Sequence, residues 1–227
     1  MKNLKLTRSV FALAAAALAA AAVGSAMAAV TVYDNGFGSR AEFKEIIKSG
    51  GGKRCDRSWR KKGKSMRAAV KRSPTTCSFR PPVQGDTELP NHSVTVAGKI
   101  LKRTDKGLRG GAFVELTVRA GGGGVGYTLR VFPHKQRFEL RRGPSAGGFP
   151  VRGTSNAISK INERNQLRVI ASGAVVRALV NGKEVARVDD TNPAQVSGRK
   201  IRFAVGSQKQ KSGSVAATVK KVAVAVP

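Results

Sequence analysis

Acidic and aromatic residues are scarce in this chain of 227 residues. It has 13 Asp and Glu against 42 Lys and Arg, and its aromatic side chains include one Trp and two Tyr. Glycoside hydrolysis needs two carboxyl groups held on either side of the scissile bond, and sugar sites usually stack the ring on an aromatic face. The composition therefore disfavours a carboxylate-rich hydrolase and an aromatic-lined sugar site.

The N-terminus has the composition of an export signal. Three cations, the last of them Arg8, precede an Ala-rich apolar stretch over residues 10–23, and small residues follow it. This order predicts cleavage after Ala28 and an exported mature chain. The alternative is an uncleaved membrane anchor. No later stretch approaches the ~20 apolar residues that span a bilayer, so we predict no transmembrane segment in the mature chain.

A formal net charge of +29 at pH 7 dominates the electrostatics of the chain, and the predicted leader carries only three of the positive charges. A surface this basic attracts polyanions without sequence discrimination. Outside the cell, such polyanions are teichoic-type wall polymers, acidic polysaccharides, anionic lipid head groups and DNA. The alternative is a compositional bias toward Arg with no specific partner.

Cys55 and Cys77 are the two cysteines of the chain. In an exported protein, an isolated pair of cysteines is most simply a disulfide. It would close a loop of about 20 residues and stabilise the fold by ~3 kcal/mol through its effect on the unfolded chain. Neither His92 nor His134 lies near a cysteine in sequence, and no spacing typical of metal ligands occurs, so no metal site is predicted there.

Residues 53–72 form a strongly basic block, in which half of the residues are Lys or Arg. One interpretation is a polyanion-binding arm, with Trp59 stacking on the ligand or inserting into it. The alternative is a solvated hairpin, pinned by the disulfide, whose Trp59 packs on the rest of the domain. Residues 78–92 are Pro-rich and polar, and they are predicted to form a linker or long loop. The cations that the arm would present to a polyanion are Arg57, Arg60, Lys61, Lys62, Lys64 and Arg67.

Three apolar runs, at about residues 166–171, 174–180 and 183–189, predict an antiparallel meander. Asn181-Gly182 separates the last two runs, and both residue types accept the positive φ angles of a type I′ turn. Ser172-Gly173 is a weaker turn signal between the first two. The two turns together fix which residues face each other across the strands.

With these turns, one face of the meander is predicted to be buried. The same register places Arg168 directly opposite Arg177 on the other face. Like charges facing each other across a ladder are destabilising, so we expect a counter-charge nearby. Either Glu184 on the neighbouring strand or an acidic ligand would supply it. The residues predicted to face the core are Leu167, Val169, Ala171, Val176, Ala178, Val180 and Val185.

Alternation and turn signals predict further strands at intervals of about ten residues, which is typical of a β-sandwich. Residues 42–48 fit either a helical turn or a second strand, and no amphipathic helix longer than two turns is predicted. The additional strands are predicted at residues 30–33, 93–103, 113–119, 127–132, 137–142, 201–206 and 215–226.

The meander also carries a family resemblance. Its pattern N-x-L-R-V…G-x-x-V-x-A-x-V-N-G-K-x-V-A-x-V-D resembles the paired strands near the end of concanavalin A-like lectin/glucanase jelly rolls, including laminin-G-like and 3-keto-disaccharide hydrolase-type domains. The runs at residues 127–133 and 137–142 resemble middle strands of the same fold. The resemblance covers residues 91–227 and lies in core and turn positions, so it implies a fold more strongly than a function. Carbohydrate or glycoconjugate is the class of ligand that it implies.

Three arginines are candidates for ligand binding. Arg168 and Arg177, joined by Arg130 if its strand lies alongside, would present guanidinium groups to carboxylate or phosphate. The alternative is that their stems pack along the sandwich while their charged ends are solvated.

Two glutamates are candidates for catalysis. Jelly-roll glucanases carry Glu-x-Asp-x-x-Glu on one strand, and this motif does not occur here. Glu115 and Glu139 lie on predicted central strands, where a pair across the sheet is one interpretation. The other is that they are counter-ions to Arg119, Arg130 or Arg141.

Calcium is common in the fold that the sequence resembles, and it needs several oxygen ligands. The one local cluster of such ligands is Asp-Asp-Thr-Asn at residues 189–192. An Asp-rich turn after a strand is usually only a turn, so no cofactor is predicted.

Together these observations predict an all-β, antiparallel sandwich of the jelly-roll type with a disulfide-pinned basic N-terminal appendage. The predicted divisions are a signal peptide at residues 1–28, the strand, basic loop and linker at 29–90, and the sandwich at 91–227. The favoured function is non-catalytic binding of acidic glycans or cell-envelope polyanions by a secreted protein. The alternatives are a glycoside-processing enzyme of the 3-keto-disaccharide hydrolase type and a structural envelope protein without a small ligand.

Overall fold

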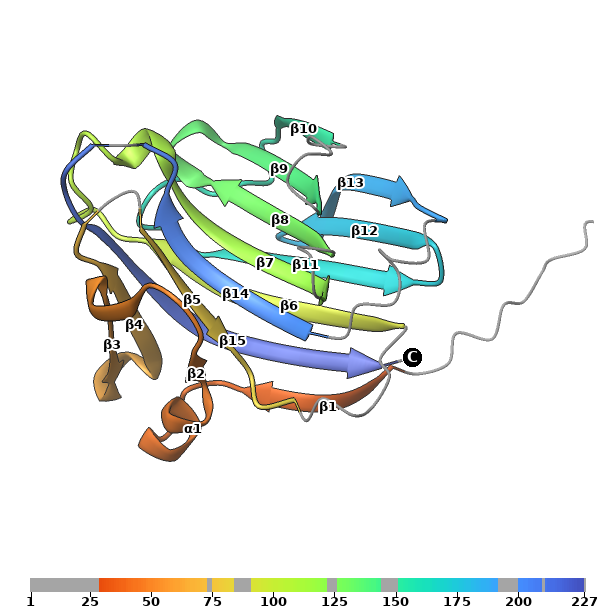
Figure 1. The fold of residues 1–227 in the computed structure, drawn as a ribbon, viewed down its shortest axis with the longest axis horizontal. Coiled ribbons are helices and arrows are strands. Elements are labelled where there is room, and N and C mark those ends of the chain that lie inside the picture. Colours follow the sequence, from red (N-terminus) through yellow and green to blue (C-terminus); the bar gives the residue numbers. More distant parts are fainter. Residues whose placement is uncertain are drawn as a thin grey trace, which may run out of the picture.

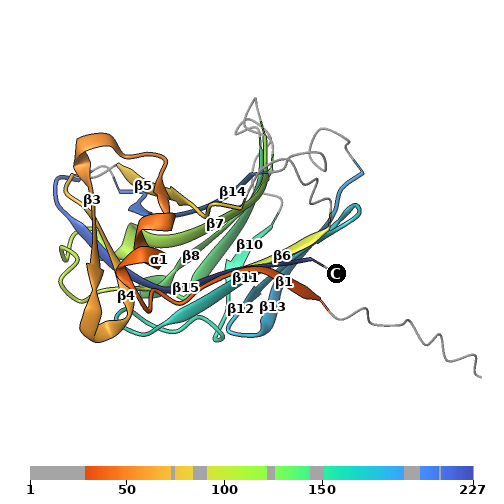
Figure 2. The ribbon, with the colours of Figure 1, turned by 90° about the horizontal axis from the view of Figure 1, so that it is seen from below.

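In the computed structural model, strands form two antiparallel sheets that pack face to face (Figures 1 and 2). The predicted all-β antiparallel sandwich is therefore confirmed. The predicted leader at residues 1–28 and residues 84–90 of the Pro-rich loop lie outside the described residues. The structure describes residues 29–72, 75–83, 91–121, 126–143, 151–191, 200–209 and 211–226.

Sheet A has eight strands. Seven follow the spatial order β13-β12-β11-β6-β15-β4-β3, and β1 pairs with β15. Figure 2 shows this sheet below the other one. Its strands are β1 (Val30–Asn35), β3 (Cys55–Arg60), β4 (Ser65–Val70), β6 (His92–Ile100), β11 (Asn165–Ser172), β12 (Val175–Val180), β13 (Lys183–Asp189) and β15 (Val215–Val226).

Sheet B has seven strands in the spatial order β10-β9-β8-β7-β14-β5-β2. It lies in front of sheet A in Figure 1. Its strands are β2 (Ile47–Lys48), β5 (Thr76–Arg80), β7 (Ala112–Ala120), β8 (Tyr127–Phe132), β9 (Arg137–Arg142), β10 (Val151–Thr154) and β14 (Lys200–Ser207).

The helical elements of the described residues are all short. The segment predicted as either helix or strand contains both, because it holds the end of α1 (Arg40–Glu45) and all of β2. Ser39 caps α1, since its Oγ accepts a hydrogen bond of 3.1 Å from the backbone N–H of Glu42. The 3-10 turns are η1 (Gly52–Arg54), η2 (Lys61–Gly63), η3 (Arg109–Gly111) and η5 (Pro133–Lys135).

Alternate residues of each strand fill the space between the sheets. On β7, Val114, Leu116 and Val118 are almost fully buried. Phe79 of β5 and Phe203 of β14 pack in the same layer, with ring centroids 5.4 Å apart. Because side chains alternate across a strand, the residues between these positions lie on the outer faces, where the candidate sites are found.

The hairpin between β12 and β13 turns at Asn181-Gly182, as predicted. The φ angles there are 50° and 84°, and Val180 pairs with Lys183. Beyond the turn a bulge shifts the pairing, so that Ala178 lies opposite Ala186. Ala186 is therefore buried on the core face, where the sequence predicted Val185.

The hairpin between β11 and β12 turns one residue later than predicted, at Gly173 and Ala174. Gly173 has a φ of 52°, which glycine adopts without strain, and it takes the first loop position. Val169 consequently lies opposite Ala178, where the sequence predicted Val176. A shift of two residues keeps every side chain on its own face, so the predicted core positions of both strands remain buried.

The two sheets extend further toward the N-terminus than the sequence predicted. Strand β4 lies inside the basic block, yet Met66, Ala68 and Val70 are fully buried. It pairs with β15, where Met66 lies opposite Val219, and β5 pairs with β14. Arg67 between these residues, with Lys64 and Lys71 on either side of the strand, concealed this alternation. Residues 29–80 thus supply strands to both sheets, whereas the sequence confined the sandwich to residues 91–227.

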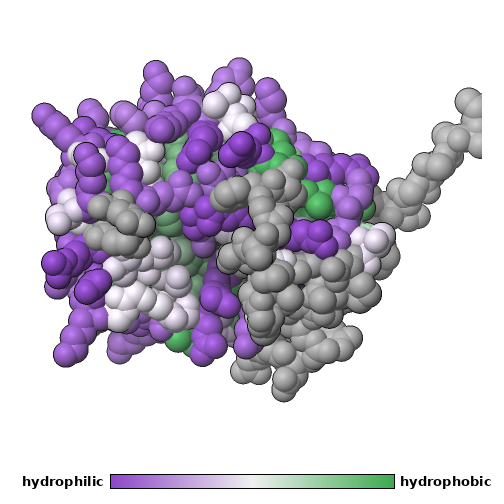
Figure 3. All heavy atoms as spheres, turned by 45° about the horizontal axis from the view of Figure 1, so that its top comes forward, coloured by the Kyte–Doolittle hydropathy of each residue, from purple (hydrophilic) through white to green (hydrophobic). Residues whose placement is uncertain are grey.

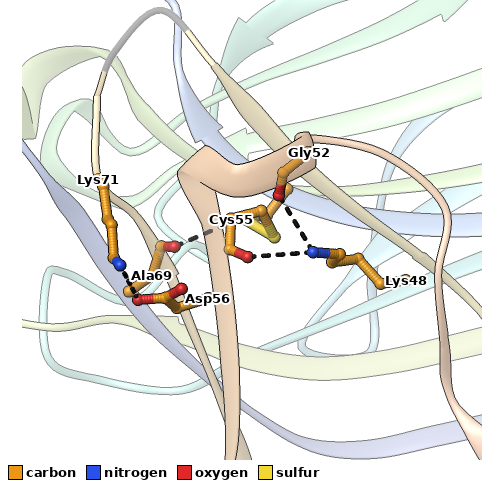
Figure 4. The surroundings of a disulfide bond; sticks show 7 residues. Lys48, Gly52, Cys55, Asp56, Ala69 and Lys71 are labelled. Atoms are coloured by element: carbon orange, nitrogen blue, oxygen red, sulfur yellow. Dashed lines mark hydrogen bonds and ion pairs between the residues drawn. A yellow bond between two sulfur atoms is a disulfide. The ribbon is translucent and has the colours of Figure 1, made fainter.

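The predicted disulfide between Cys55 and Cys77 is present, with 5.3 Å between the Cα atoms (Figure 4). Cys55 begins β3 in sheet A, and Cys77 lies in β5 of sheet B, so the disulfide links the two layers. Lys48 Nζ donates hydrogen bonds to the backbone oxygens of Gly52 and Cys55, at 3.1 and 3.4 Å. The basic hairpin β3–β4 is therefore fixed to the opposite sheet at one end.

Candidate functional site

The outer face of sheet A carries a basic cleft of about 620 Å³. It lies where β3, β4, β15 and β6 run side by side. Because side chains alternate between the two faces of a strand, only every second residue points into the cleft. On β6, Val96 and Ile100 are buried on the core side, whereas Lys99 faces outward into the cleft.

Seven cations line this basic cleft, and its described lining contains no acidic or aromatic residue. They come from four separate parts of the chain: the β3–β4 hairpin, β6 with the loop after it, the turn before β11, and β15. Pairing of strands that are distant in sequence brings them together. The seven are Arg60, Lys62, Lys99, Lys102, Arg103, Arg164 and Lys220.

No carboxylate among the described residues forms an ion pair with a cation of the basic cleft. Within the described part of the chain, ion pairs join acids to other cations, such as Lys221 to Asp34 at 3.0 Å and Lys71 to Asp56 at 2.9 Å, and none involves a cleft residue. Exposed cations without counter-ions repel one another and hold a positive potential that an anion can neutralise. The cleft is therefore electrostatically prepared for a negatively charged ligand.

Crowding of positive charge is also visible at Arg103. Burial lowers the pKa of its guanidinium, and the neighbouring charges of Arg67 and Arg60 lower that pKa further. Arg67 thus belongs to the same region of positive potential, although it does not line the cleft.

Only some of the six predicted polyanion-binding cations lie at the basic cleft. Arg60 and Lys62 line the basic cleft, and Arg67 lies close enough to influence it. Lys61 and Lys64 lie at the η2 turn and do not line it. The sixth residue, Arg57, contacts the N-terminal segment instead of the cleft.

Arg57 and Trp59 hold the hairpin against the N-terminal segment. The Arg57 guanidinium donates to the backbone oxygen of Ile46 and lies 4.9 Å from the centroid of the Phe43 ring. Burial lowers its pKa. The Trp59 indole N–H donates to the backbone oxygen of Phe37 at 3.0 Å. Trp59 thus packs within the domain, as in the second of the two sequence interpretations.

The predicted trio of Arg168, Arg177 and Arg130 does not come together. In the corrected register Arg177 lies opposite Ile170, so Arg168 and Arg177 do not face each other directly. Arg177 instead pairs with Glu184 at 2.6 Å, which confirms the protein counter-charge that the sequence suggested.

Arg168 and Arg130 lie on different sheets. Arg168 donates a hydrogen bond of 2.8 Å to Ser93 Oγ on sheet A. Arg130 lies on β8 of sheet B, where its Nε is 2.7 Å from Glu115 Oε2. It can therefore not join the other two arginines at one ligand.

The outer face of sheet B carries an arginine–glutamate ladder. It comprises Glu115, Arg130, Glu139, Arg137 and Arg141, on adjacent strands β7, β8 and β9. Glu139 is 4% exposed and is 3.1 Å from Arg137 and 3.3 Å from Arg141. The two glutamates are thus counter-ions, in agreement with one sequence interpretation. Figure 3, tilted to bring the β9–β10 side forward, shows mainly hydrophilic residues, with hydrophobic ones in small areas between them.

Aromatic rings support this arginine–glutamate ladder from the same face. The Arg130 guanidinium lies 4.0 Å from the Phe113 ring centroid, and that of Arg137 lies 4.2 Å from Phe132. Burial lowers the pKa of Arg141, and the charge of Arg130 lowers it further, while Glu139 opposes this change. Each arginine is thus held by a carboxylate, a ring, or both.

The Asp-rich turn that was considered as a calcium site makes contacts with other side chains of the protein. Asp190 accepts a hydrogen bond from the Tyr127 hydroxyl and lies 2.7 Å from Arg142 Nε. Burial and this hydrogen bond raise the pKa of Tyr127 well above its usual value. Asn192 lies outside the described residues. Among those described, no cluster of three His, Cys, Asp or Glu residues is suited to a metal ion.

The fold is that of the concanavalin A-like and galectin-like jelly rolls, which include carbohydrate-binding modules and alginate lyases. A protein of unknown function with a galectin-like fold from Bacillus subtilis superposes with a TM-score of 0.60 at 13% identity, covering 87% of this chain and 97% of that one. The carbohydrate-binding module CBM66 from Bacillus subtilis gives 0.53 at 13% identity, covering 78% and 94%. Alginate lyase A1-II′ gives 0.52 at 14% identity, covering 72% and 80%.

These identities establish the fold alone. A scan of protein-family models and a search of curated proteins give no match to the chain. None of the helices in the described residues has the length and apolar character needed to cross a bilayer.

Proposed function

We propose that this protein is a secreted, non-catalytic binding protein for acidic glycans or other cell-envelope polyanions. The observation that carries the proposal is the basic cleft, in which seven cations face one volume of about 620 Å³ and form no ion pair with an acid of the described residues. Volumes of this size are typical of ligand sites. The carbohydrate-binding proteins among the structural neighbours support glycans as a ligand class.

Features outside the basic cleft support the cellular location. The leader-like N-terminal sequence is typical of exported chains. The disulfide between Cys55 and Cys77 is stable in an oxidising compartment and rare in the cytosol. A secreted or envelope-associated protein would meet wall polymers and acidic polysaccharides directly, and its positive charge would hold it there.

A binding experiment with two polysaccharides tests this function. We expect the protein to bind polygalacturonate, which is acidic, and not dextran, which is neutral. The paired variant Lys99→Gln with Lys220→Gln should weaken this binding about tenfold, since two cations of the cleft are lost. The matched control Lys44→Gln with Arg152→Gln removes the same net charge from exposed positions outside the cleft and should bind as the wild type does. Equal binding of both polysaccharides would contradict the proposal.

A glycoside-processing activity is the second candidate, because an alginate lyase and a carbohydrate esterase are among the structural neighbours. Glu115 and Glu139 are the acids available on the outer face of sheet B. Glu115 accepts a hydrogen bond from Arg130, and Glu139 forms ion pairs with Arg137 and Arg141; a substrate would have to displace these arginines before reaching either carboxylate. Turnover of a glycoside panel that is lost in Glu115→Gln or Glu139→Gln would favour the enzyme over the binding protein.

A further inference from the structure

The basic cleft supplies many hydrogen-bond donors and few acceptors. Lys and Arg side chains only donate, and its other polar side chains are Ser65, Asn162 and Thr218. A sugar hydroxyl both donates and accepts, so a site for neutral sugar rings needs acceptors beside its donors. This cleft instead suits a ligand whose surface consists of acceptor oxygens.

The described lining of the basic cleft also lacks a flat apolar surface. No Trp, Tyr or Phe lines it, and Trp59 of the neighbouring hairpin donates to Phe37 instead. Stacking on aromatic rings is the usual way in which proteins hold unpaired nucleobases, and it contributes ~1–3 kcal/mol per base. Recognition in this cleft must therefore depend on charged groups and not on rings or bases.

The cations of the basic cleft are spread over a distance that one small anion cannot span. Arg60 lies on β3 and Lys99 on β6, and β4 and β15 lie between these strands. Three strand spacings amount to about 14 Å. A single phosphate or carboxylate would contact one part of the cleft, whereas an extended chain that crosses the strands could reach all of it.

The number of cations in the basic cleft, relative to the volume of the cleft, indicates how densely charged a bound polymer would be. A site of this size holds a drug-sized segment, which for a polymer of sugar acids means a few rings with one carboxylate each. Seven cations exceed that charge. In a chain, each linking phosphate carries one negative charge and two non-bridging oxygens, and polyphosphate and poly(glycerol phosphate) both need fewer atoms per charge than a polymer of sugar acids. Arginine can bind the two oxygens with two parallel hydrogen bonds. Arg60, Arg103 and Arg164 supply guanidinium groups for these hydrogen bonds from three separate segments of the lining.

We propose that the basic cleft selects a chain of closely spaced phosphate groups, either a polyphosphate or a phosphate-ester polymer, over a polymer of sugar acids. This inference rests on the proposed polyanion-binding function and specifies the ligand of the same site. The phosphates lie across β3, β4, β15 and β6, with arginines binding oxygens in pairs and lysines acting as point charges.

The test compares three polymers at equal concentrations of negative charge: sodium polyphosphate, poly(glycerol phosphate) and polygalacturonate. We expect both phosphate polymers to bind at least tenfold more tightly than polygalacturonate. Preference between the first two distinguishes an inorganic chain from a wall-type phosphate ester. For the better of them, Lys99→Gln with Lys220→Gln should reduce the slope of log K against log salt by about 1.4, at ~0.7 per lost contact.

Controls separate the possible outcomes. Lys44→Gln with Arg152→Gln should leave the salt slope unchanged, and thermal unfolding of all variants checks their folding. If the first pair disturbs folding, Arg60→Gln with Lys62→Gln replaces it, since both lie on the hairpin at the other side of the basic cleft. Polygalacturonate that binds as tightly as the phosphate polymers would overturn this inference while leaving the proposed function intact. Failure of all three polymers to bind, or equal losses in the control pair, would overturn both.

Discussion

The two outer faces of the sandwich use arginine and lysine in opposite ways. On sheet B, the arginine–glutamate ladder matches its cations with carboxylates, and Glu139 is 4% exposed. On sheet A, the basic cleft gathers seven cations, and its described lining contains no acid. The ladder carries its counter-charges within the protein, whereas the cleft cations have none among the described residues and can gain them from a ligand. The contrast indicates which face is built for structure and which for a ligand.

Salt should affect the two faces most differently. For a polyanion that contacts about seven cations, raising the salt concentration from 50 to 200 mM should lower affinity about a thousandfold. The ladder is less exposed and is screened less, so thermal stability should change little over the same range. Titration of polyphosphate and thermal unfolding at both salt concentrations measure the two effects. A binding constant that does not change with salt would remove the distinction between the faces.

Loss of the disulfide should weaken the basic cleft more than the arginine–glutamate ladder. Cys55→Ser with Cys77→Ser removes the link between the basic hairpin and sheet B, and the free energy of unfolding should fall by about 3 kcal/mol. Arg60 and Lys62 lie on that hairpin, so polyphosphate binding should also fall in protein that remains folded. Urea unfolding and titration at low temperature measure the two changes. Unaltered stability would show that strand pairing alone fixes the hairpin.

The arginine–glutamate ladder should depend strongly on Glu139. Glu139→Gln leaves Arg137 and Arg141 without their carboxylate and should destabilise the protein by about 2 kcal/mol, a moderate value because both arginines are partly exposed. The control is Glu184→Gln, whose pair with Arg177 is largely solvent-exposed and should contribute about 0.5 kcal/mol. Denaturant unfolding measures both. Equal effects would mean that the ladder does not stabilise the fold through its charges.

The smallest effect is expected for a single cation of the basic cleft. Lys99→Gln should change the free energy of unfolding by less than about 0.5 kcal/mol, because no carboxylate loses its partner and repulsion within the cleft is reduced. The same denaturant experiment measures it. A large loss of stability would show that Lys99 has a structural role and would weaken the contrast between the two faces.

Local patterns in the sequence predicted much of the fold. Asn181-Gly182 located a turn because few other dipeptides accept two positive φ angles. Gly173 was equally visible, but the sequence did not show which of two adjacent dipeptides forms the turn. That error changed which residues face each other without moving any to the other face, so the core prediction survived and the opposition of Arg168 and Arg177 did not.

The basic cleft was harder to predict, because it depends on contacts between distant parts of the chain. Arg60 and Lys62 were recognised within a basic block. Lys99 and Lys220 lie on strands and Arg164 directly precedes one; sheet order decides which strands are neighbours, and no local pattern states that order. The alternation of Val222, Val224 and Val226 does not show that β15 lies between β4 and β6, and a register shift at Lys220 interrupts it.

The position of the two last strands has a consequence for how the protein reaches its native state. β15 lies between β6 and β4, and β14 lies between β7 and β5, so neither sheet is continuous without residues 200–226. The strands β6, β11, β12 and β13, like β7 to β10, pair without this segment, but β4 and β5 join the rest of their sheets only when it is present. Such long-range pairing slows folding. The basic cleft, which spans β3, β4, β15 and β6, therefore forms only once this C-terminal segment has taken its place between the other strands.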